Sequence, residues 1–472
     1  MTDRESKHEE KIKMSTKFVK TRGNRFTIGD KEIIFNGIGI GSWFNMEHFM
    51  VGLPGTDSQI RQTFNLAFGL ERGRRILDEF TQDFMTEDDF AYLKSHNINL
   101  IRVPFRYNMF IDDNGDRVPD GYRYIDRLMR MAEKYEIYVL PDLHTAPGGQ
   151  NPDWHSDNQT GYTGFWRFCA LQDMVVDMWD DLSKHLSDEK YLLGYDVLNE
   201  PFIIPALLTG KEDTDDCATG ARMEGSVRIL RNFYHRVLTA VRKNDSNHIV
   251  FFEGDHFASD FNGLDDFEDP QVAFSFHFYP TVWYPDLYED TYSREERKKI
   301  FREVLDRLMT QAGAGGRPIL CGEAGYEIRT MGFERVRPMI QDTIDLFHER
   351  KLSFTFWSYK DIGFMGMVQP DDNTAWKKLA DRVGKRWDHH LEMDLGHELT
   401  DECCRKGYED ATALDRYILF FRARSLYYPL EEKYILLPLL TSLSEEEANA
   451  LPESFLFKNC RRNEEFAKMF DL

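Results

Sequence analysis

Short runs of β-branched and aromatic residues recur through the first three quarters of the chain, with helix-like polar stretches between them. This alternation is typical of parallel strands that are joined by crossover helices. Eight strands are predicted: Ile33–Ile40, Ile98–Pro104, Ile137–His144, Leu192–Glu200, Ile249–Gly254, Val272–Tyr279, Pro318–Gly325 and Ser353–Tyr359.

Helical spacing of apolar positions fills the stretches between these strands. The clearest cases are Glu87–Ser95, Tyr122–Tyr135, Leu171–Leu186, Val227–Lys243, Arg294–Met309 and Glu334–Arg350. Eight strand-helix alternations predict an α/β fold, a (β/α)8 or TIM barrel, enlarged by insertions above the usual ~250 residues.

A doubly wound open sheet is the alternative fold. It would place a glycine fingerprint directly after its first strand, at the start of a helix. Gly37, Gly39 and Gly41 are spaced GxGxG, but no helix pattern opens directly behind them. The match is weak, so the barrel is the preferred prediction.

Two segments fall outside the repeat. Residues 45–80 form a long first strand-to-helix loop with helical character at Ile60–Leu70, and we expect it to fold over one end of the barrel. From about Lys377 the pattern becomes helical and charged. We therefore divide the chain into a disordered segment 1–24, a barrel 25–376, and a helical extension 377–472 packed on the barrel or making a homo-oligomer contact. Nothing in the extension suggests chemistry.

Charge and hydropathy exclude several classes of protein. The 472 residues include 59 Lys and Arg against 81 Asp and Glu, for a formal charge of −22. Such a field repels phosphate backbones, so nucleic acid is not an expected partner. No stretch approaches the ~18 to 20 apolar residues of a membrane span. The start, MTDRESKHEEKIKM, lacks the apolar core of a signal peptide, and we expect a cytoplasmic protein.

Cysteine spacing and aromatic content narrow the chemistry further. The six cysteines form no CxxC pair, which predicts thiols rather than disulfides and argues against a zinc site. Aromatic residues make up 14% of the chain, and many stand beside His, Asn, Asp or Glu. A large core explains most of them, and stacking against sugar rings is a second role for the others.

Polar residues close many of the predicted strands. In a (β/α)8 barrel the chemistry lies at the carboxyl ends of the strands, so these residues are the candidates. Taken singly, an arginine can be a structural ion-pair partner, a histidine a buried and satisfied one, and a tryptophan plain core. The candidates are Glu47, Arg102, His144, Asn199, Glu200, His277, Tyr279, Glu323 and Trp357.

Glu200 and Glu323 differ from the rest, because a carboxyl inside apolar sequence costs several kcal/mol unless it is paired or functional. The strands that end at them, the fourth and seventh, lie across the barrel from each other. Two facing carboxyls suggest glycoside hydrolysis, in which one protonates the leaving oxygen and the other attacks the anomeric carbon. Arg102 and Tyr279 would keep the nucleophile ionised, and Asn199 would bind the sugar 2-hydroxyl.

The segments INLIRVP, LPDLH, YDVLNEP, FSFHFYP, LCGEAGY and FTFWSYKD resemble, in order, the strand-end motifs of glycoside hydrolase family 5, over residues 30–375. That family is a retaining (β/α)8 family. The resemblance implies Glu200 as acid/base and Glu323 as nucleophile, without metal or cofactor. It also implies a sugar subsite lined by Arg102, His144, Asn199, His277, Tyr279 and Trp357.

Two further segments, DLHTAPGGQN and GSWFNMEH, are similar to the exo-β-1,3-glucanase branch of that family. The similarity implies that Glu47 grips the terminal sugar and that Asp157 and Asn158 form another sugar-binding pair, although the loop here carries the extra residues PDWHS. The chain departs from endoglycoceramidases, which usually read HQD where this chain has His144-Thr145-Ala146. It also departs from the secreted fungal exo-glucanases in lacking a signal.

These observations predict a retaining β-glycosidase that acts on a carbohydrate substrate, the non-reducing end of a β-glucoside. Endo-acting glucanase or mannanase activity, and hydrolysis of glycolipids or plant aryl glycosides, remain alternatives. A carbohydrate-binding protein without activity would gain nothing from two opposed carboxyls. An interaction scaffold built on the helical extension could coexist with catalysis.

Overall fold

Eight parallel strands close a barrel in this computed structural model, which describes residues 18–203, 221–264, 267–407 and 410–471. Every predicted run overlaps one barrel strand, so the (β/α)8 prediction is confirmed and the open sheet is wrong. In order around the barrel the strands are β4 (Asn36–Gly39), β5 (Leu100–Arg106), β6 (Tyr138–Thr145), β7 (Gly194–Asp196), β8 (Ile249–Glu253), β9 (Val272–Phe278), β10 (Ile319–Ala324) and β11 (Ser353–Phe356).

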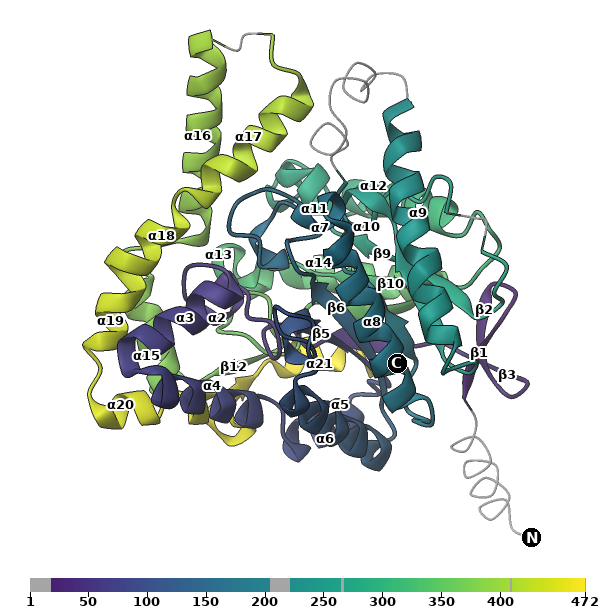
Figure 1. Ribbon diagram of the computed structural model, residues 1–472, viewed down its shortest axis with the longest axis horizontal. Coiled ribbons are helices and arrows are strands. Elements are labelled where there is room, and N and C mark those ends of the chain that lie inside the picture. The colour runs from purple at the N-terminus through teal and green to yellow at the C-terminus, as the bar shows by residue number, and fades with distance from the viewer. Residues whose placement is uncertain (1–17, 204–220, 265–266, 408–409, 472) are drawn as a thin grey trace.

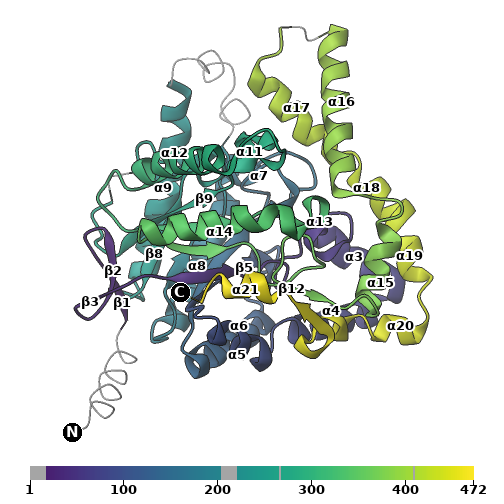
Figure 2. The same ribbon diagram turned by 180° about the vertical axis from the view of Figure 1, so that it is seen from behind.

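Amphipathic helices surround the barrel (Figures 1 and 2). Each buries its apolar stripe against the strands; α12, for example, buries Phe301, Leu305 and Leu308 and is capped at Ser293, whose hydroxyl accepts from Glu296 N. The predicted helices correspond to α5 (Glu87–Ser95), α6 (Pro119–Tyr135), α8 (Cys169–Leu186), α9 (Ala221–Arg242), α12 (Arg294–Ala312) and α14 (Phe333–Glu349).

The GxGxG spacing in the first barrel strand serves packing. A Cβ atom at Gly39 would lie 2.5 Å from Cε3 of Trp357, and one at Gly41 would lie 2.6 Å from Cζ2 of the same ring. Both distances are far inside van der Waals contact. The glycines therefore leave room for the Trp357 indole at the barrel mouth.

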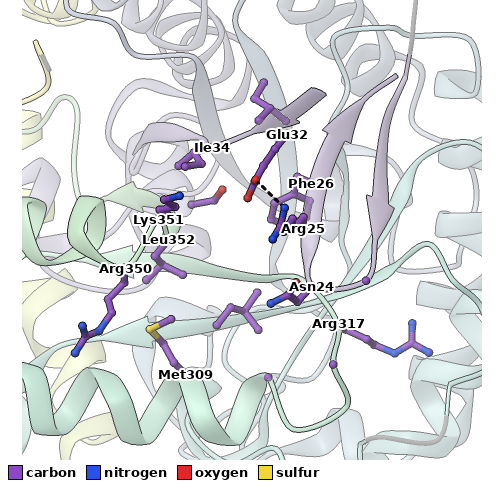
Figure 3. Close-up of a pocket in the computed structure, with 16 residues that line it drawn as sticks. Asn24, Arg25, Phe26, Glu32, Ile34, Met309, Arg317, Arg350, Lys351 and Leu352 are labelled. Atoms are coloured by element: carbon purple, nitrogen blue, oxygen red, sulfur yellow. Dashed lines mark hydrogen bonds and ion pairs between the residues drawn. The ribbon is translucent and has the colours of Figure 1, made fainter. Parts of the chain in front are cut away.

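A small antiparallel sheet covers the amino end of the barrel: β1 (Val19–Arg22), β2 (Arg25–Ile28) and β3 (Lys31–Ile33). The segment 1–24 was expected to be disordered. Its residues 1–17 lie outside the described residues, whereas Val19–Arg22 pair with β2 and bury Val19. A cavity of about 750 Å³ lies between this sheet and the amino ends of β10 and β11, lined by Arg317 and Arg350 (Figure 3). It lies at the end of the barrel opposite to the strand-end candidates.

The long first loop is helical over most of its length. It holds α2 (His48–Val51), α3 (Asp57–Phe68) and α4 (Leu70–Phe84), of which only the region of α3 was predicted as a helix. Gly69, at φ 81°, separates α3 from α4 and lets the chain turn between them.

The C-terminal extension leaves the barrel and returns to it. Helices α16 (His389–Gly407) and α17 (Ala413–Ser425) form a pair that stands beyond the barrel in both views (Figures 1 and 2). Further on, β13 (Cys460–Arg462) pairs with β12 (Val368–Pro370), a short strand that the sequence pattern did not predict. The remaining elements are α15 (Ala375–Val383), α18 (Tyr428–Glu431), the π-helical turn η6 (Glu432–Leu436), α19 (Leu437–Thr441), α20 (Glu445–Asn449), the 3₁₀ turns η7 (Pro452–Phe455) and η8 (Phe457–Asn459), and α21 (Glu464–Lys468).

Within the described residues, no helix combines the length and apolarity that a bilayer span requires. The described cysteines are free thiols, as predicted, and Cys217 lies outside the described residues.

A buried lysine ties the extension to the first loop. Lys360 is fully buried, and its Nζ lies 2.5 Å from Asp89 Oδ1. The same ammonium donates to the carbonyls of Phe84, at 2.6 Å, and Phe455, at 2.9 Å, while the Tyr359 hydroxyl donates to Asp89. This one cation therefore joins α4, α5, η7 and the segment after β11.

We expect Lys360→Met to lower the free energy of unfolding by about 3–5 kcal/mol, because it leaves the Asp89 carboxylate buried without its counter-charge. Urea denaturation followed by tryptophan fluorescence measures the loss. Adding Asp89→Asn should recover part of it. Lys299→Met removes an exposed pair with Glu303 and serves as the control, with an expected loss under about 1 kcal/mol. Equal losses in Lys360→Met and Lys299→Met would refute the interpretation.

Candidate active site

The carboxyl ends of the barrel strands bring most of the predicted polar residues together. Arg102 belongs to β5, His144 to β6, His277 to β9 and Glu323 to β10. Asn199, Glu200, Tyr279 and Trp357 follow β7, β9 and β11 within a few residues. All of these side chains are buried or nearly so, which places them in the barrel mouth rather than on its outer surface.

Arg102 occupies the centre of this group. Its guanidinium is fully buried, and it reaches Glu323 Oε1 at 2.6 Å and Asn199 Oδ1 at 2.8 Å. Three further carboxyls surround it: Asp196 at 2.9 Å, Glu253 at 3.0 Å and Asp142 at 3.1 Å. One cation does not neutralise four carboxylates. Burial and the nearby Glu253 therefore raise the pKa of Asp196 well above its usual value, despite its bond to Arg102.

Glu200 and Glu323 face each other across a short gap. An oxygen of each carboxyl and a nitrogen of His277 all lie within 4.8 Å of one another. His277 Nδ1 is 2.6 Å from Glu200 Oε1, and the Tyr279 hydroxyl donates to Glu323 Oε2 at 2.8 Å. Two carboxyls at this separation can act on one bond between them, one as nucleophile and one as proton donor.

His155 is a member of the site that the sequence analysis missed. It lies in the 3₁₀ turn η2 (Trp154–Ser156), and its Nε2 is 3.0 Å from Glu200 Oε2. Each Glu200 oxygen thus has its own imidazole. The residues around the motif PDWHS show no periodicity and lie outside every strand, so no pattern signalled the contact.

The two imidazoles reverse the expected proton affinity of Glu200. Burial alone would raise its pKa, but His277 and His155 outweigh burial and hold the pKa of Glu200 well below its usual range. Burial likewise opposes charge on His277, yet Glu323, Glu253 and Glu200 raise the pKa of His277 well above its usual value. These opposite pKa shifts favour an ion pair between the Glu200 carboxylate and the His277 imidazolium.

Glu47 and His144 form a second buried pair next to this gap. His144 Nδ1 bonds to Asp142 Oδ2 at 2.7 Å, and its Nε2 lies 3.4 Å from Glu47 Oε1. Burial would lower the pKa of His144, but Asp142 and Glu47 raise it to about 10. The Trp357 indole lies parallel to the His144 ring, with centroids 5.9 Å apart. These side chains offer a charged hydrogen-bonding wall beside a flat apolar face.

Asp157 and Asn158 do not join the cluster, in contrast to the sequence-based expectation. Asp157 accepts from Ser58 N at 2.9 Å and bonds to the Ser58 hydroxyl, while Asn158 Nδ2 donates to the carbonyls of Asn151 and Tyr162. Burial and Asp57 raise the pKa of Asp157 to about 6. Asp157 thus joins its loop to α3, and Asn158 holds its own loop in place.

A cavity of about 1,100 Å³ opens beside Glu200, between the barrel and the C-terminal extension. His155, Glu200, His277 and Tyr279 line the barrel side. Helices α16 and α17 supply the facing wall, which the sequence pattern did not indicate. The lining residues from these helices include Met393, His397, Tyr417, Phe420, Phe421 and Arg424.

Arg424 fastens this wall to the barrel loops. Its guanidinium is 1% exposed and reaches Asp153 Oδ1 at 2.8 Å and Glu392 Oε1 at 2.9 Å. The same Glu392 oxygen lies 3.1 Å from Nε2 of His48, the residue that follows Glu47. Through these bonds α16 and α17 contact both the loop of His155 and the loop of Glu47.

Three clusters of the described residues have the spacing of metal ligands: Asp142, Asp196 and Glu253; His48, His389 and Glu392; and Glu200, His277 and Glu323. A cation already occupies the first, since Arg102 bonds to all three carboxyls. Arg424 binds the carboxylate oxygen of the second. The third is the facing carboxyl pair with its own imidazole.

Comparison with known proteins agrees with this geometry. The model of the cellulase family, glycosyl hydrolase family 5, matches residues 61–363. A beta-xylosidase of Phanerodontia chrysosporium is 32% identical over 478 residues, which cover 94% of this chain and 95% of that protein. Glucan 1,3-beta-glucosidase 2 of Saccharomyces cerevisiae is 28% identical over 46% of this chain and 41% of its own.

Among solved structures, a rutinosidase from Aspergillus niger superposes with a TM-score of 0.54 at 18% identity, over 71% of this chain and 92% of that one. This likeness supports the barrel fold alone. The match to the beta-xylosidase covers more of the chain than the barrel does, so it reaches into the C-terminal extension.

We expect Arg102→Met to make stability fall more steeply as pH rises through neutrality. Without the guanidinium, the buried Asp196 carboxyl binds its proton still more tightly in the folded than in the unfolded chain, so the stability that this proton contributes is lost as pH rises. The melting temperature of the variant should drop between pH 5.5 and pH 8. Lys299→Met, whose partner Glu303 is exposed, is the control and should leave the profile of the parent unchanged. A variant profile parallel to that of the parent would contradict the assignment.

Proposed function

This chain belongs to glycosyl hydrolase family 5 and is a glycoside hydrolase, and we propose that it releases single sugars from the non-reducing end of β-glucosides with retention of configuration. The facing pair Glu200 and Glu323 carries the proposal. Their oxygens lie within 4.8 Å, close to the ~5–5.5 Å that a nucleophile and an acid/base need in a retaining mechanism.

In the first step, a Glu323 oxygen attacks the anomeric carbon and the bond from that carbon to the aglycone oxygen breaks. Arg102 and Tyr279, at 2.6 and 2.8 Å, hydrogen-bond to the Glu323 carboxylate and fix its orientation. The departing oxygen takes a proton from Glu200, and the sugar is left as an ester of Glu323.

The proton for that step reaches Glu200 from His277 across their 2.6 Å hydrogen bond. The charge of Glu323 is the leading cause that raises the pKa of His277, against the opposing effect of burial. As Glu323 becomes an ester it loses this charge, and the imidazole holds its proton less tightly. Attack by the nucleophile and proton delivery to the leaving group thus favour each other.

In the second step, Glu200 takes a proton from a water molecule, whose oxygen attacks the anomeric carbon and displaces Glu323. The incoming water occupies the face that the aglycone left, so the configuration is retained. Water exclusion by the surrounding loops strengthens the hydrogen bonds to the reacting sugar.

The sugar itself would lie against Trp357, with Glu47 and His144 binding its outer hydroxyls. Asn199 Oδ1 accepts from Arg102, while the structure gives Nδ2 no acceptor among the described residues. This buried donor is available to the sugar 2-hydroxyl.

Exo action is supported by the packing behind Glu47. Helix α2 follows Glu47 directly, and the His48 ring packs 3.8 Å from that of Trp154. Phe49 packs against Phe364, with centroids 4.7 Å apart. Such close packing beside Glu47 favours a site closed on this side, which would accept one terminal sugar rather than a continuous chain.

β-Xyloside hydrolysis is the second candidate, because the relative matched over 94% of this chain is named a beta-xylosidase. Because xylose lacks the hydroxymethyl group of glucose, the hydrolysis rates of a β-glucoside and a β-xyloside distinguish the two candidate activities. Nitrophenyl β-glucoside, β-xyloside, β-mannoside and β-galactoside provide that comparison.

We expect β-1,3 and β-1,4 oligosaccharides to release monosaccharide from the first turnovers, because the closed wall admits only the terminal sugar. Chromatography of products at under 5% conversion is the measurement. Early accumulation of trimers and longer products would show an open cleft and refute exo action.

Rescue by azide distinguishes the catalytic roles of Glu200 and Glu323. On dinitrophenyl β-glucoside, Glu200→Ala should still form the glycosyl-enzyme, because this leaving group needs little protonation, and azide should restore turnover with a β-glycosyl azide product. Glu323→Ala should be almost inactive, and any azide rescue should give the α-glycosyl azide. Proton NMR of the products identifies the anomer of each glycosyl azide. Net inversion by the parent enzyme, or exchanged azide anomers, would refute the assignment.

A further inference from the structure

The 1,100 Å³ cavity lies on one side of the catalytic pair. Its described lining includes Glu200 and two of its contacts, His155 and His277, but not Glu323 or Trp357. Glu200 is the carboxyl that faces the leaving oxygen under the proposed function. The cavity is therefore the place where the leaving group lies.

Aromatic rings run without interruption from Glu200 to the C-terminal extension. The His155 ring, which contacts Glu200, lies 6.0 Å from Phe257, and Phe257 lies 5.1 Å from Phe202. Phe202 in turn lies 5.5 Å from Tyr417 of α17, and Phe421 of the same helix lies 6.4 Å from Phe257. The barrel loops and the extension thus form one aromatic surface.

Apolar side chains at the outer edge of this cavity are exposed. Val282 and Trp283, which end α11 (Pro280–Trp283), are 71% and 40% exposed, and Tyr417 is 37% exposed. Grouped exposed apolar side chains mark binding surfaces, because leaving them in water is unfavourable. Since they border the leaving-group cavity, a substrate that extends outward from Glu200 would cover them.

Charged side chains in the same lining pair with one another. Arg424 bonds to Asp153, and Arg416 of α17 bonds to Asp401 of α16. Because these charged side chains already bond to each other, new hydrogen bonds from them to sugar hydroxyls would contribute little to binding. An apolar ligand leaves these pairs intact and replaces water only over the aromatic surface.

The backbone at Phe257 adds a second observation. His256, Phe257 and Ala258 have φ values of 55°, 56° and 58°, the left-handed region that non-glycine residues rarely adopt. Such strain over three residues persists where a ligand-binding surface depends on it. Here the turn holds the Phe257 ring between His155 and Phe421.

From these observations we propose that α16 and α17 build the aglycone site, and that the aglycone is an apolar group, such as an alkyl chain or a fused-ring alcohol, rather than a second sugar. The proposal rests on the assignment of Glu200 as the proton donor. Tyr417 and Met393 are the extension residues that bind the aglycone, and Phe202 and Phe257 are their partners from the barrel.

Alkyl β-glucosides of increasing length test the proposal with the full chain, replaced by alkyl β-xylosides if nitrophenyl β-xyloside is the faster substrate. Alcohols of this series differ little as leaving groups, so differences report binding of the chain. We expect kcat/KM to rise about two- to fourfold per added methylene from butyl to octyl. Laminaribiose and cellobiose should fall below the octyl glycoside.

Tyr417→Ala should lower the octyl-to-methyl ratio of kcat/KM at least threefold. Tyr434→Ala, another exposed tyrosine of the extension that lies outside the cavity lining, should leave that ratio unchanged. The ratio cancels any general loss of active enzyme, so partial misfolding of a variant does not imitate the effect.

The outcomes distinguish the two proposals. The enzyme could hydrolyse nitrophenyl β-glycosides and yet show no increase in kcat/KM along the alkyl series, or prefer disaccharides to the octyl glycoside. Either result overturns the apolar aglycone and leaves the proposed function standing. Failure to hydrolyse any β-glycoside overturns the proposed function, and the aglycone proposal fails with it. If kcat/KM rises with alkyl chain length and Tyr417→Ala does not reduce this rise, the proposed role of the extension is wrong.

Discussion

The arrangement of the barrel mouth depends on the hydrogen bonds and ion pairs of one side chain, Arg102. It is a fully buried cation that bonds to side chains contributed by β6, β7, β8 and β10, including the proposed nucleophile. Desolvating an arginine is unfavourable unless several carboxylates compensate, and desolvating those carboxylates is unfavourable without the arginine. The strand ends and the position of the Glu323 carboxylate are therefore fixed together, and no single member of the group can change alone.

The two imidazoles beside Glu200 set the electrostatics of the catalytic pair. Burial alone would raise the pKa of Glu200, and its lowered pKa follows from two imidazoles at 2.6 and 3.0 Å. Under the proposed function, His277 stores the proton that Glu200 delivers to the leaving group.

The barrel and the strand-end residues could be predicted from sequence because both follow from local patterns: apolar runs that form strands, and a polar residue that closes each run, as at Arg102 and Glu323. His155 could not be predicted, since it reaches Glu200 from an irregular loop. Asp142, Asp196 and Glu253 stand inside or at the end of apolar runs, and only the closure of the barrel shows that they share one arginine. The wall of α16 and α17 depends on contacts between residues more than 150 positions apart, such as Phe202 and Tyr417, which no periodicity encodes.

Strand β13 returns the chain to β12 after the excursion through α16 and α17. The helix pair is therefore an insert held at both ends rather than a free tail, and its inner face can vary while the strands that carry Glu200 and Glu323 stay unchanged. Evolution can exchange such an insert as a module: a family of enzymes could diversify the molecules it accepts through these helices alone. Grafting the segment between β12 and β13 from a relative would, on the same reasoning, transfer preference without rebuilding the chemistry.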